Sequence, residues 1–170
     1  KDVIIFRKDG LFELNTRYFT HHTKGVKMTW EGGEPTVGAL YSNYMVKMFG
    51  EPRKKRQPLT QFHLDLAASV QAITEDVIFH MLNHLYMRTG IKNICIAGGV
   101  AQNSAANGKI LANTPFKNLY VPSAGHDAGT SIGSAMFLYH HELKNKREEP
   151  CYSAYTGSQY SDEEIEQVLV

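Results

Sequence analysis

The spacing of apolar residues divides the first part of the chain into short elements. An apolar run at 3–6 is separated by the polar turn 8–10 from a second run at 11–14, which predicts a β-hairpin with a primed turn at Asp-Gly. The stretch 18–34 has no clear period and is expected to be an irregular loop. The next segment, 35–48, is expected to be helical because it begins with proline and is followed by glycine.

The clearest periodic pattern predicts one long helix. Thr60 is a suitable N-cap, the pattern continues to about Arg88, and Gly90 ends it. Apolar residues recur at three- and four-residue steps along this segment, which predicts one buried stripe. The residues of the stripe are Val70, Ile73, Val77, Met81 (or Ile78), Leu82 and Leu85.

The second half alternates strands and helices. A short apolar strand at 93–97 is followed by two glycines and a helix at 101–111. A second strand at 119–121 leads into a loop at 125–129 and a helix at 130–144. This alternation is typical of α/β domains, in which helices pack on a sheet.

Composition limits the classes of protein to which the chain can belong. With 170 residues, 42% of them hydrophobic, it can bury one sizeable core, and one domain is expected. The balance of 18 Lys+Arg against 17 Asp+Glu argues against a nucleic-acid partner. No apolar run approaches the ~20 residues of a membrane span.

The two cysteines indicate neither a disulfide framework nor a metal site. Cys95 and Cys151 lie far apart and lack the spacing of metal ligands, so a cytoplasmic location is expected. Cys95 lies in an apolar run, which predicts a buried free thiol.

The ends of the sequence suggest an excised piece of a longer protein. The chain opens directly into a strand-like run without a methionine. Charged residues at 144–150 mark the edge of the expected domain, and a capping-box pattern at 161–164 begins a last short helix. We therefore expect a domain at 1–150 and, at 151–170, a linker with a short helix.

The first candidate site is the glycine turn after the strand at 93–97. Gly98 and Gly99 allow the backbone to approach a ligand, and the following helix directs N–H groups into the same space. Asn103 would face this pocket with both a donor and an acceptor. The alternative is a tight turn that serves close helix-to-strand packing.

The second candidate site is the loop around Gly125 and Asp127. Small neighbouring residues leave the Asp127 carboxylate accessible, so it suits a metal ion or a phosphate-bound cation. The alternative, favoured by this segment alone, is that Asp127 caps the next helix. Both candidate loops follow adjacent strands at their carboxyl ends, where open α/β sheets bind ligands.

Several other polar clusters have simpler explanations. His80 and His84 share a helix face, but no general-base glutamate follows His80 and no third ligand is evident, so surface histidines are expected. The adjacent pairs at 21–22 and 140–141 have diverging side chains. The basic cluster 53–56 is expected to be a solvated loop, with phosphate contact as the alternative.

Five segments of the chain resemble the nodulation and antibiotic O-carbamoyltransferases, and together they span nearly its whole length. The run Gly-Gly-Val-Ala-x-Asn with its Ala-Asn-Gly-Lys extension is specific, and the Asp-Ala-Gly-Thr run moderately so. The segments are 49–53, 63–71, 96–110, 121–135 and 154–161.

The resemblance implies a fold and a reaction. It implies an α/β lobe of the ribonuclease-H-like, actin-like ATPase type, similar to threonylcarbamoyl transferases, with helices packed on a central mixed sheet. A C-terminal adenylating domain would make carbamoyl adenylate from carbamoyl phosphate and ATP. The actin-like domain would then transfer the carbamoyl group to a hydroxyl of a small-molecule acceptor, using a divalent metal, typically Fe(II).

The resemblance also assigns roles to residues of this chain. Asp127 matches the second-lobe aspartate that holds the metal and supports catalysis. Gly98, Gly99, Asn103 and Gly125 match segments that line the nucleotide pocket. The histidines of the first lobe and the adenylating domain are absent from the sequence, so the isolated fragment is expected to be inactive.

Other interpretations remain open at this stage. The chain could belong to another actin-like ATPase such as a sugar kinase, or be a non-catalytic nucleotide-binding module. Apolar surface left exposed by a missing lobe would also allow self-association. The acceptor and the roles of Arg53 and Lys109 are not decided by the sequence.

Overall fold

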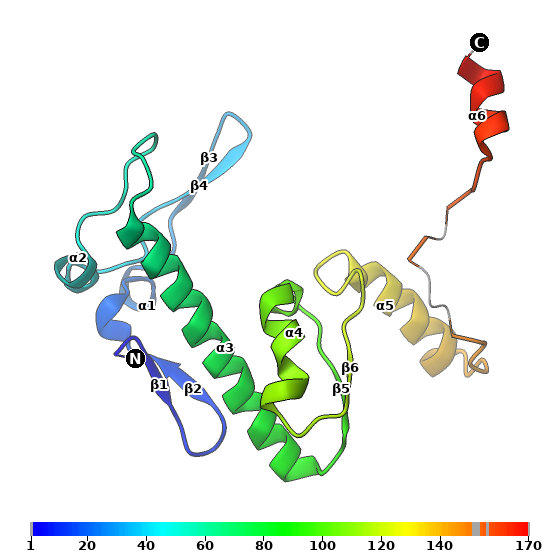
Figure 1. Ribbon diagram of the computed structural model, residues 1–170, viewed down its shortest axis with the longest axis horizontal. Helices are drawn as coiled ribbons and strands as arrows, with labels where there is room; N and C mark the ends of the chain where they lie inside the picture. The colour runs from blue at the N-terminus through cyan, green and yellow to red at the C-terminus, as the bar shows by residue number, and fades with distance from the viewer. Residues whose placement is uncertain (1, 151–153, 156, 170) are drawn as a thin grey trace. The chain divides into compact units, whose positions relative to one another are not determined.

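The computed structural model describes residues 2–150, 154–155 and 157–169, so Cys151 lies outside the described residues. The chain divides into two compact units. The first consists of Lys1–Ile94 and Asn103–Tyr120, and the second of Cys95–Gln102 and Val121–Val170. Helices and strands alternate along the chain, which confirms the α/β class (Figure 1).

The N-terminal hairpin forms as predicted, but its turn differs. Strands β1 (Ile4–Phe6) and β2 (Phe12–Leu14) pair antiparallel. Within the turn only Gly10 has a positive φ, at 83°, and the Arg7 N–H donates to the Leu11 carbonyl at 2.9 Å. Both kinds of primed turn need a positive φ at the first central residue, here Asp9, so the prediction of that turn is wrong.

A second hairpin occupies part of the segment predicted to be irregular. Strands β3 (Met28–Glu31) and β4 (Glu34–Val37) pair antiparallel, and Gly32 and Gly33 between them have φ values of 60° and 85°. These are the backbone angles of a primed turn. A short helix, α1 (His21–Lys24), precedes this hairpin.

The helix predicted over 35–48 is shorter than expected. Pro35 belongs to β4, and the helix α2 runs only from Asn43 to Phe49. The Ser42 hydroxyl accepts a hydrogen bond from the Tyr44 N–H at 3.2 Å and so caps the helix. Gly50, with φ 85°, ends it as predicted.

Helix α3 (Gln61–Thr89) organises the first unit and confirms the long helix predicted from periodicity. At its start the His63 Nδ1 accepts a hydrogen bond from the Thr60 N–H at 3.1 Å. At its end Gly90 adopts the left-handed conformation, with φ 65°. The β1–β2 hairpin and helix α4 (Ser104–Asn113) both pack against α3 (Figure 1).

Histidines of α3 hold the hairpin in place. The His80 Nε2 lies 2.9 Å from the Arg7 carbonyl oxygen and 3.2 Å from that of Leu11. Gly10 is buried against the next histidine along the helix face, His84. The two histidines therefore join secondary-structure elements and are more than surface residues.

The remaining elements confirm the predicted alternation with shifted ends. Strands β5 (Asn93–Cys95) and β6 (Asn118–Tyr120) pair in a third two-stranded sheet. Helix α5 (Gly129–Phe137) continues into a π-helical turn, and α6 (Asp162–Leu169) follows. The Ser161 N–H donates to Glu164 Oε2 at 2.7 Å, which confirms the predicted capping box.

The predicted central sheet and sizeable core are not formed by the described residues. The strands form three separate two-stranded sheets, and each offers too little surface to bury many side chains. Leu82 of the predicted α3 stripe is buried, whereas Val70 is 56% exposed. The Cys95 thiol is exposed, so its predicted burial is wrong. The buried apolar residues are Tyr18, Leu82, Ala101, Ala106, Ile110 and Phe116.

Among the described residues, none of the helices combines the length and the apolar character that crossing a bilayer requires.

Gly10→Ala is expected to weaken the first unit. A Cβ at position 10 would lie 2.1 Å from Cγ and 2.3 Å from Cβ of His84, and a positive φ adds strain. The loss should be about 1–3 kcal/mol beyond that of the strain alone. Gly33→Ala is the matched control, because Gly33 has a φ of 85° and no atom within 4 Å of the added Cβ. Equal losses in urea unfolding would show that the contact with His84 does not restrict the turn.

Candidate functional site

The two predicted glycine loops meet in the second unit. The Gly98 N–H donates a hydrogen bond to the Gly125 carbonyl oxygen at 2.6 Å. Gly98 has a φ of 104°, a conformation that side-chain-bearing residues rarely adopt. The structure thus brings together one residue from each loop that sequence analysis assigned to a nucleotide site.

Close packing explains the glycine at position 125. Gly125 is buried, and a Cβ there would lie 2.9 Å from the Gln102 Nε2 and 3.0 Å from the Pro122 carbonyl oxygen. Gly99 differs, because no atom lies within 4 Å of its Cβ position. The open side of the turn is therefore at Gly98 and Gly99, where the backbone is accessible to a ligand.

Asp127 does not cap the helix that follows it. The N-cap of α5 is Ala128, and no side chain forms a cap hydrogen bond there. The Asp127 residue is exposed, and its carboxylate forms no hydrogen bond or ion pair with the described residues. The capping alternative is therefore wrong, and the carboxylate remains accessible to a ligand.

The loop that carries Asp127 is closed by a tight backbone contact. A Cβ at Gly129 would lie 2.0 Å from the Ala124 carbonyl oxygen, so only glycine fits. The Gly129 N–H also donates to the His126 carbonyl at 2.9 Å. These contacts fix the ends of the segment that holds the carboxylate.

The described residues do not form a complete metal site. Within the described ranges, no group of three His, Cys, Asp or Glu side chains is arranged to hold a metal ion. One exposed carboxylate suits a hard cation as a single ligand but does not bind it with useful affinity. Asp127 therefore fits a shared metal site only as one contributor.

The Asn103 amide has different partners from those predicted. Asn103 lies in the first unit, where its Nδ2 donates to the Gln71 Oε1 at 2.9 Å. Its Oδ1 accepts from the Gln71 Nε2 at 3.1 Å and from the Ala106 N–H at 3.0 Å. The acceptor that was expected to face a ligand is therefore occupied by α3 and by the first turn of α4.

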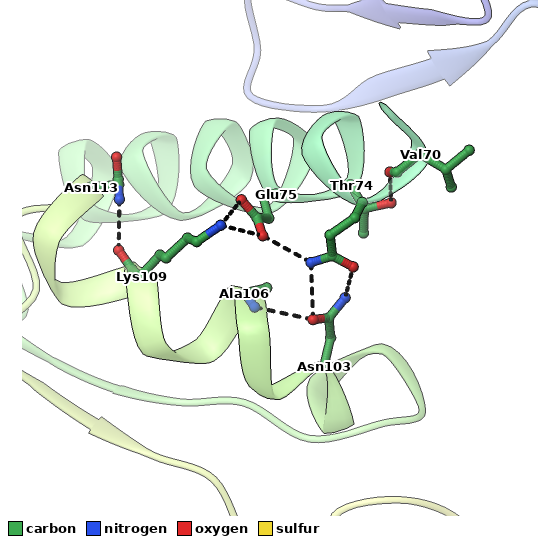
Figure 2. A network of polar contacts seen from close by, with 8 residues as sticks. Val70, Thr74, Glu75, Asn103, Ala106, Lys109 and Asn113 are labelled. Carbon is green, nitrogen blue, oxygen red and sulfur yellow. Dashed lines mark hydrogen bonds and ion pairs between the residues drawn. The ribbon is translucent and has the colours of Figure 1, made fainter. Parts of the chain in front are cut away.

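A nearly buried carboxylate extends this network along α3 (Figure 2). Glu75 is 8% exposed and accepts a hydrogen bond from the Gln71 Nε2 at 2.9 Å. The Lys109 Nζ lies 2.8 Å from its Oε1 and 2.7 Å from its Oε2. Lys109 is thus paired with Glu75 rather than left free for phosphate.

Gln71 and Glu75 were not predicted from the sequence as members of this network. Both lie inside the long helix, one turn apart, where polar residues usually face solvent. A signal was present nonetheless, because Gln71 and Glu75 share the helix face of the apolar positions Ile78 and Leu82. A carboxylate on the apolar face of a helix requires a partner, and here that partner is Lys109.

The basic cluster at 53–56 forms its own local contacts. The Arg53 Nη1 donates to the Gln57 carbonyl at 2.5 Å, and the Gln57 Oε1 accepts from the Lys54 N–H. This segment borders a cavity of about 650 Å³ in the first unit with a mainly apolar lining. None of the five predicted site residues lines it. An apolar lining does not suit phosphate. The cavity therefore gives no support to the alternative in which this loop contacts phosphate.

The sequence matches one protein family over most of its length. Residues 11–136 match the family described as Carbamoyltransferase N-terminus. The chain belongs to the carbamoyltransferase family. The resemblance found in the sequence is thereby confirmed at the level of the family.

Relatives of this carbamoyltransferase-family chain are longer proteins. An uncharacterized protein of Synechocystis is 36% identical over 173 residues, which cover 99% of this chain and 26% of the relative. Nodulation protein NolNO of Sinorhizobium fredii is 40% identical over 121 residues, 71% of this chain and 18% of the relative. A tRNA N6-adenosine threonylcarbamoyltransferase of Fervidobacterium nodosum is 43% identical over 58 residues, 34% of this chain and 17% of the relative. The chain thus spans about a quarter or less of these relatives.

Gly129→Ala is expected to distort the Asp127 loop of the carbamoyltransferase-family chain. The added Cβ would overlap the Ala124 carbonyl oxygen, and the free energy of unfolding should fall by about 1–3 kcal/mol. Gly133→Ala, in the same helix with open space around it, should instead stabilise by about 0.5–1 kcal/mol. Thermal unfolding measures both, and a neutral result for Gly129→Ala would contradict the close contact.

The Glu75 carboxylate should make stability depend on acid pH. Hydrogen bonds from Gln71 and then Lys109 hold the pKa of Glu75 below its ordinary value. A lowered pKa in the folded state stabilises the fold above the unfolded-state pKa of about 4.3, and this contribution is lost as pH falls through the folded-state pKa. Urea unfolding should therefore show the advantage of wild type over Glu75→Gln shrinking below about pH 4.3. A constant difference from neutral to acid pH would contradict this assignment.

Proposed function

We propose that the chain forms the second lobe of the actin-like catalytic domain of an O-carbamoyltransferase. The family match over residues 11–136 supports carbamoyl transfer. Relatives named as nodulation proteins and threonylcarbamoyltransferases support the same chemistry. The observation that carries the proposal is the backbone hydrogen bond between Gly98 and Gly125, which joins the two loops expected to line the nucleotide pocket.

The proposed donor is carbamoyl adenylate, made from carbamoyl phosphate and ATP by another part of the protein. The acceptor hydroxyl attacks the carbamoyl carbon, the new C–O bond forms, and the bond from that carbon to the phosphate oxygen breaks. AMP leaves and the hydroxyl proton is released. The product is the carbamate ester of a small-molecule acceptor.

The residues of this chain bind and orient the donor. The accessible backbone at Gly98 and Gly99 suits close approach of the nucleotide, since no side chain intervenes. Asp127 supplies one oxygen ligand to a divalent metal, proposed to be Fe(II), whose other ligands lie outside this sequence. When bound, that metal would polarise the carbamoyl group. A fragment with only this lobe is proposed to be inactive.

The products of ATP distinguish this function from its alternatives. The full natural protein is incubated with ATP, Fe(II) and carbamoyl phosphate, and adenine nucleotides are separated. AMP that forms only with carbamoyl phosphate is expected. ADP that forms regardless of carbamoyl phosphate would contradict the proposal and favour a kinase. Nucleotide binding without any turnover would favour a binding module.

Asp127→Asn is expected to abolish most carbamoyl transfer and lower the iron content of the full natural protein. The substitution keeps the shape of the side chain but removes the charge that favours a cation. The control is Asp76→Asn, which makes the same change at an exposed aspartate elsewhere in the chain, on α3. Iron is measured by elemental analysis, independently of activity. Unchanged iron content in Asp127→Asn would contradict the metal-binding role.

A further inference from the structure

A chain of hydrogen bonds links α3 and α4 (Figure 2), and the group at each of its ends has a fixed role, as acceptor at one end and as donor at the other. At one end the Glu75 carboxylate, ionised beside Lys109, can only accept hydrogen bonds. At the other end the backbone N–H of Ala106 can only donate. Between them lie two side-chain amides, Gln71 and Asn103, each of which could in principle point either way.

The carboxylate decides how the Gln71 amide points. Only the NH₂ group of Gln71 can donate to Glu75, at 2.9 Å, so its Oε1 must point toward Asn103. This Oε1 then requires a donor from Asn103, which the Nδ2 supplies at 2.9 Å. Glu75 thus fixes the orientation of the Gln71 amide, and Gln71 in turn favours one orientation of the Asn103 amide.

The Ala106 N–H requires the same orientation of Asn103 from the other side. The Asn103 Oδ1 must face it, and the Gln71 Nε2 supplies a second donor to that oxygen at 3.1 Å. A carbonyl oxygen accepts about two hydrogen bonds, so the Oδ1 has no further acceptor capacity. Of the Asn103 amide, one N–H is not used by the described residues.

We propose that Gln71 and Glu75 are positioning residues that fix the Asn103 amide with a single N–H available to a ligand. This inference rests on the proposed function and on the sequence-based prediction that Asn103 contacts the nucleotide. The ligand atom that meets Asn103 is then a hydrogen-bond acceptor, such as a ring nitrogen or a ribose or phosphate oxygen of ATP. A ligand donor at this position would be disfavoured.

Glu75→Gln and Lys109→Gln both break the ion pair between these two residues, but only Lys109→Gln keeps the carboxylate that orients Gln71. Glu75→Gln replaces the pure acceptor with an amide, so Gln71 loses the group that orients it, and Asn103 keeps only the Ala106 N–H as an orienting contact. Lys109→Gln keeps the carboxylate and therefore keeps the orientation. Lys109→Gln still offers an N–H donor to the nearly buried Glu75 carboxylate, although the positive charge is lost. A purely structural ion pair would make the two variants alike.

The orientation is measured on the full natural protein by ¹⁵N NMR of asparagine side chains. The Asn103 NH₂ signals, assigned with Asn103→Asp, should show one slowly exchanging proton, because one N–H is bonded to Gln71. This pattern should persist in Lys109→Gln, whereas in Glu75→Gln the protected proton should exchange faster, because its acceptor on Gln71 is no longer held by the carboxylate. Persistence of the slow exchange in Glu75→Gln would overturn the proposal. If Glu75→Gln does not fold, Glu75→Met provides the same test, since it also removes the acceptor that orients Gln71 and leaves the Gln71 amide in place.

The functional consequence is measured by calorimetric titration with ATP and by the KM for ATP. Glu75→Gln and Asn103→Asp should both bind ATP about tenfold more weakly, with kcat changed much less. Lys109→Gln should stay within about threefold of wild type. Equal weakening in Glu75→Gln and Lys109→Gln would overturn the positioning role. Wild type that binds no ATP would contradict the proposed function, and the NMR pattern would still decide the orientation.

Discussion

The Glu75 carboxylate, nearly buried between two helices, is the constraint on which the first unit depends. An ionised group with 8% exposure requires charged and polar partners, and it obtains them from Lys109 of α4 and Gln71 of its own helix. The contact with Lys109 holds α4 against α3. The hairpin uses other contacts of α3, at His80 and His84. One helix therefore positions elements that precede it and elements that follow it in the chain.

The parts of the fold that depend on local chemistry could be predicted from the sequence. Thr60 and Gly90 mark the ends of α3 because caps and left-handed glycines act within one turn of the backbone. The β3–β4 hairpin was missed although Gly32 and Gly33 form a recognised turn signal, because a proline in the second strand, Pro35, suggested a helix start instead.

The parts that depend on distant partners could not be predicted. The burial of Val70 or Cys95 depends on which elements cover them, and periodicity does not contain that information. Similarly, the glycines of the candidate site were found from the sequence, but the partner of Asn103 was not. Gln71 lies 32 residues before it, and only the packing of two helices brings their amides together.

The hydrogen bond between Gly98 and Gly125 joins two main-chain atoms. Apart from proline at position 98, which has no N–H, no single replacement can delete either the donor or the acceptor, whereas a contact such as Lys109 to Glu75 is lost by one substitution. Variation can otherwise break the loop junction only through shape, by filling the space at Gly125 or forbidding the backbone angle of Gly98. At Gly99 the packing leaves room for a side chain, so this backbone frame can accommodate different side chains at that position.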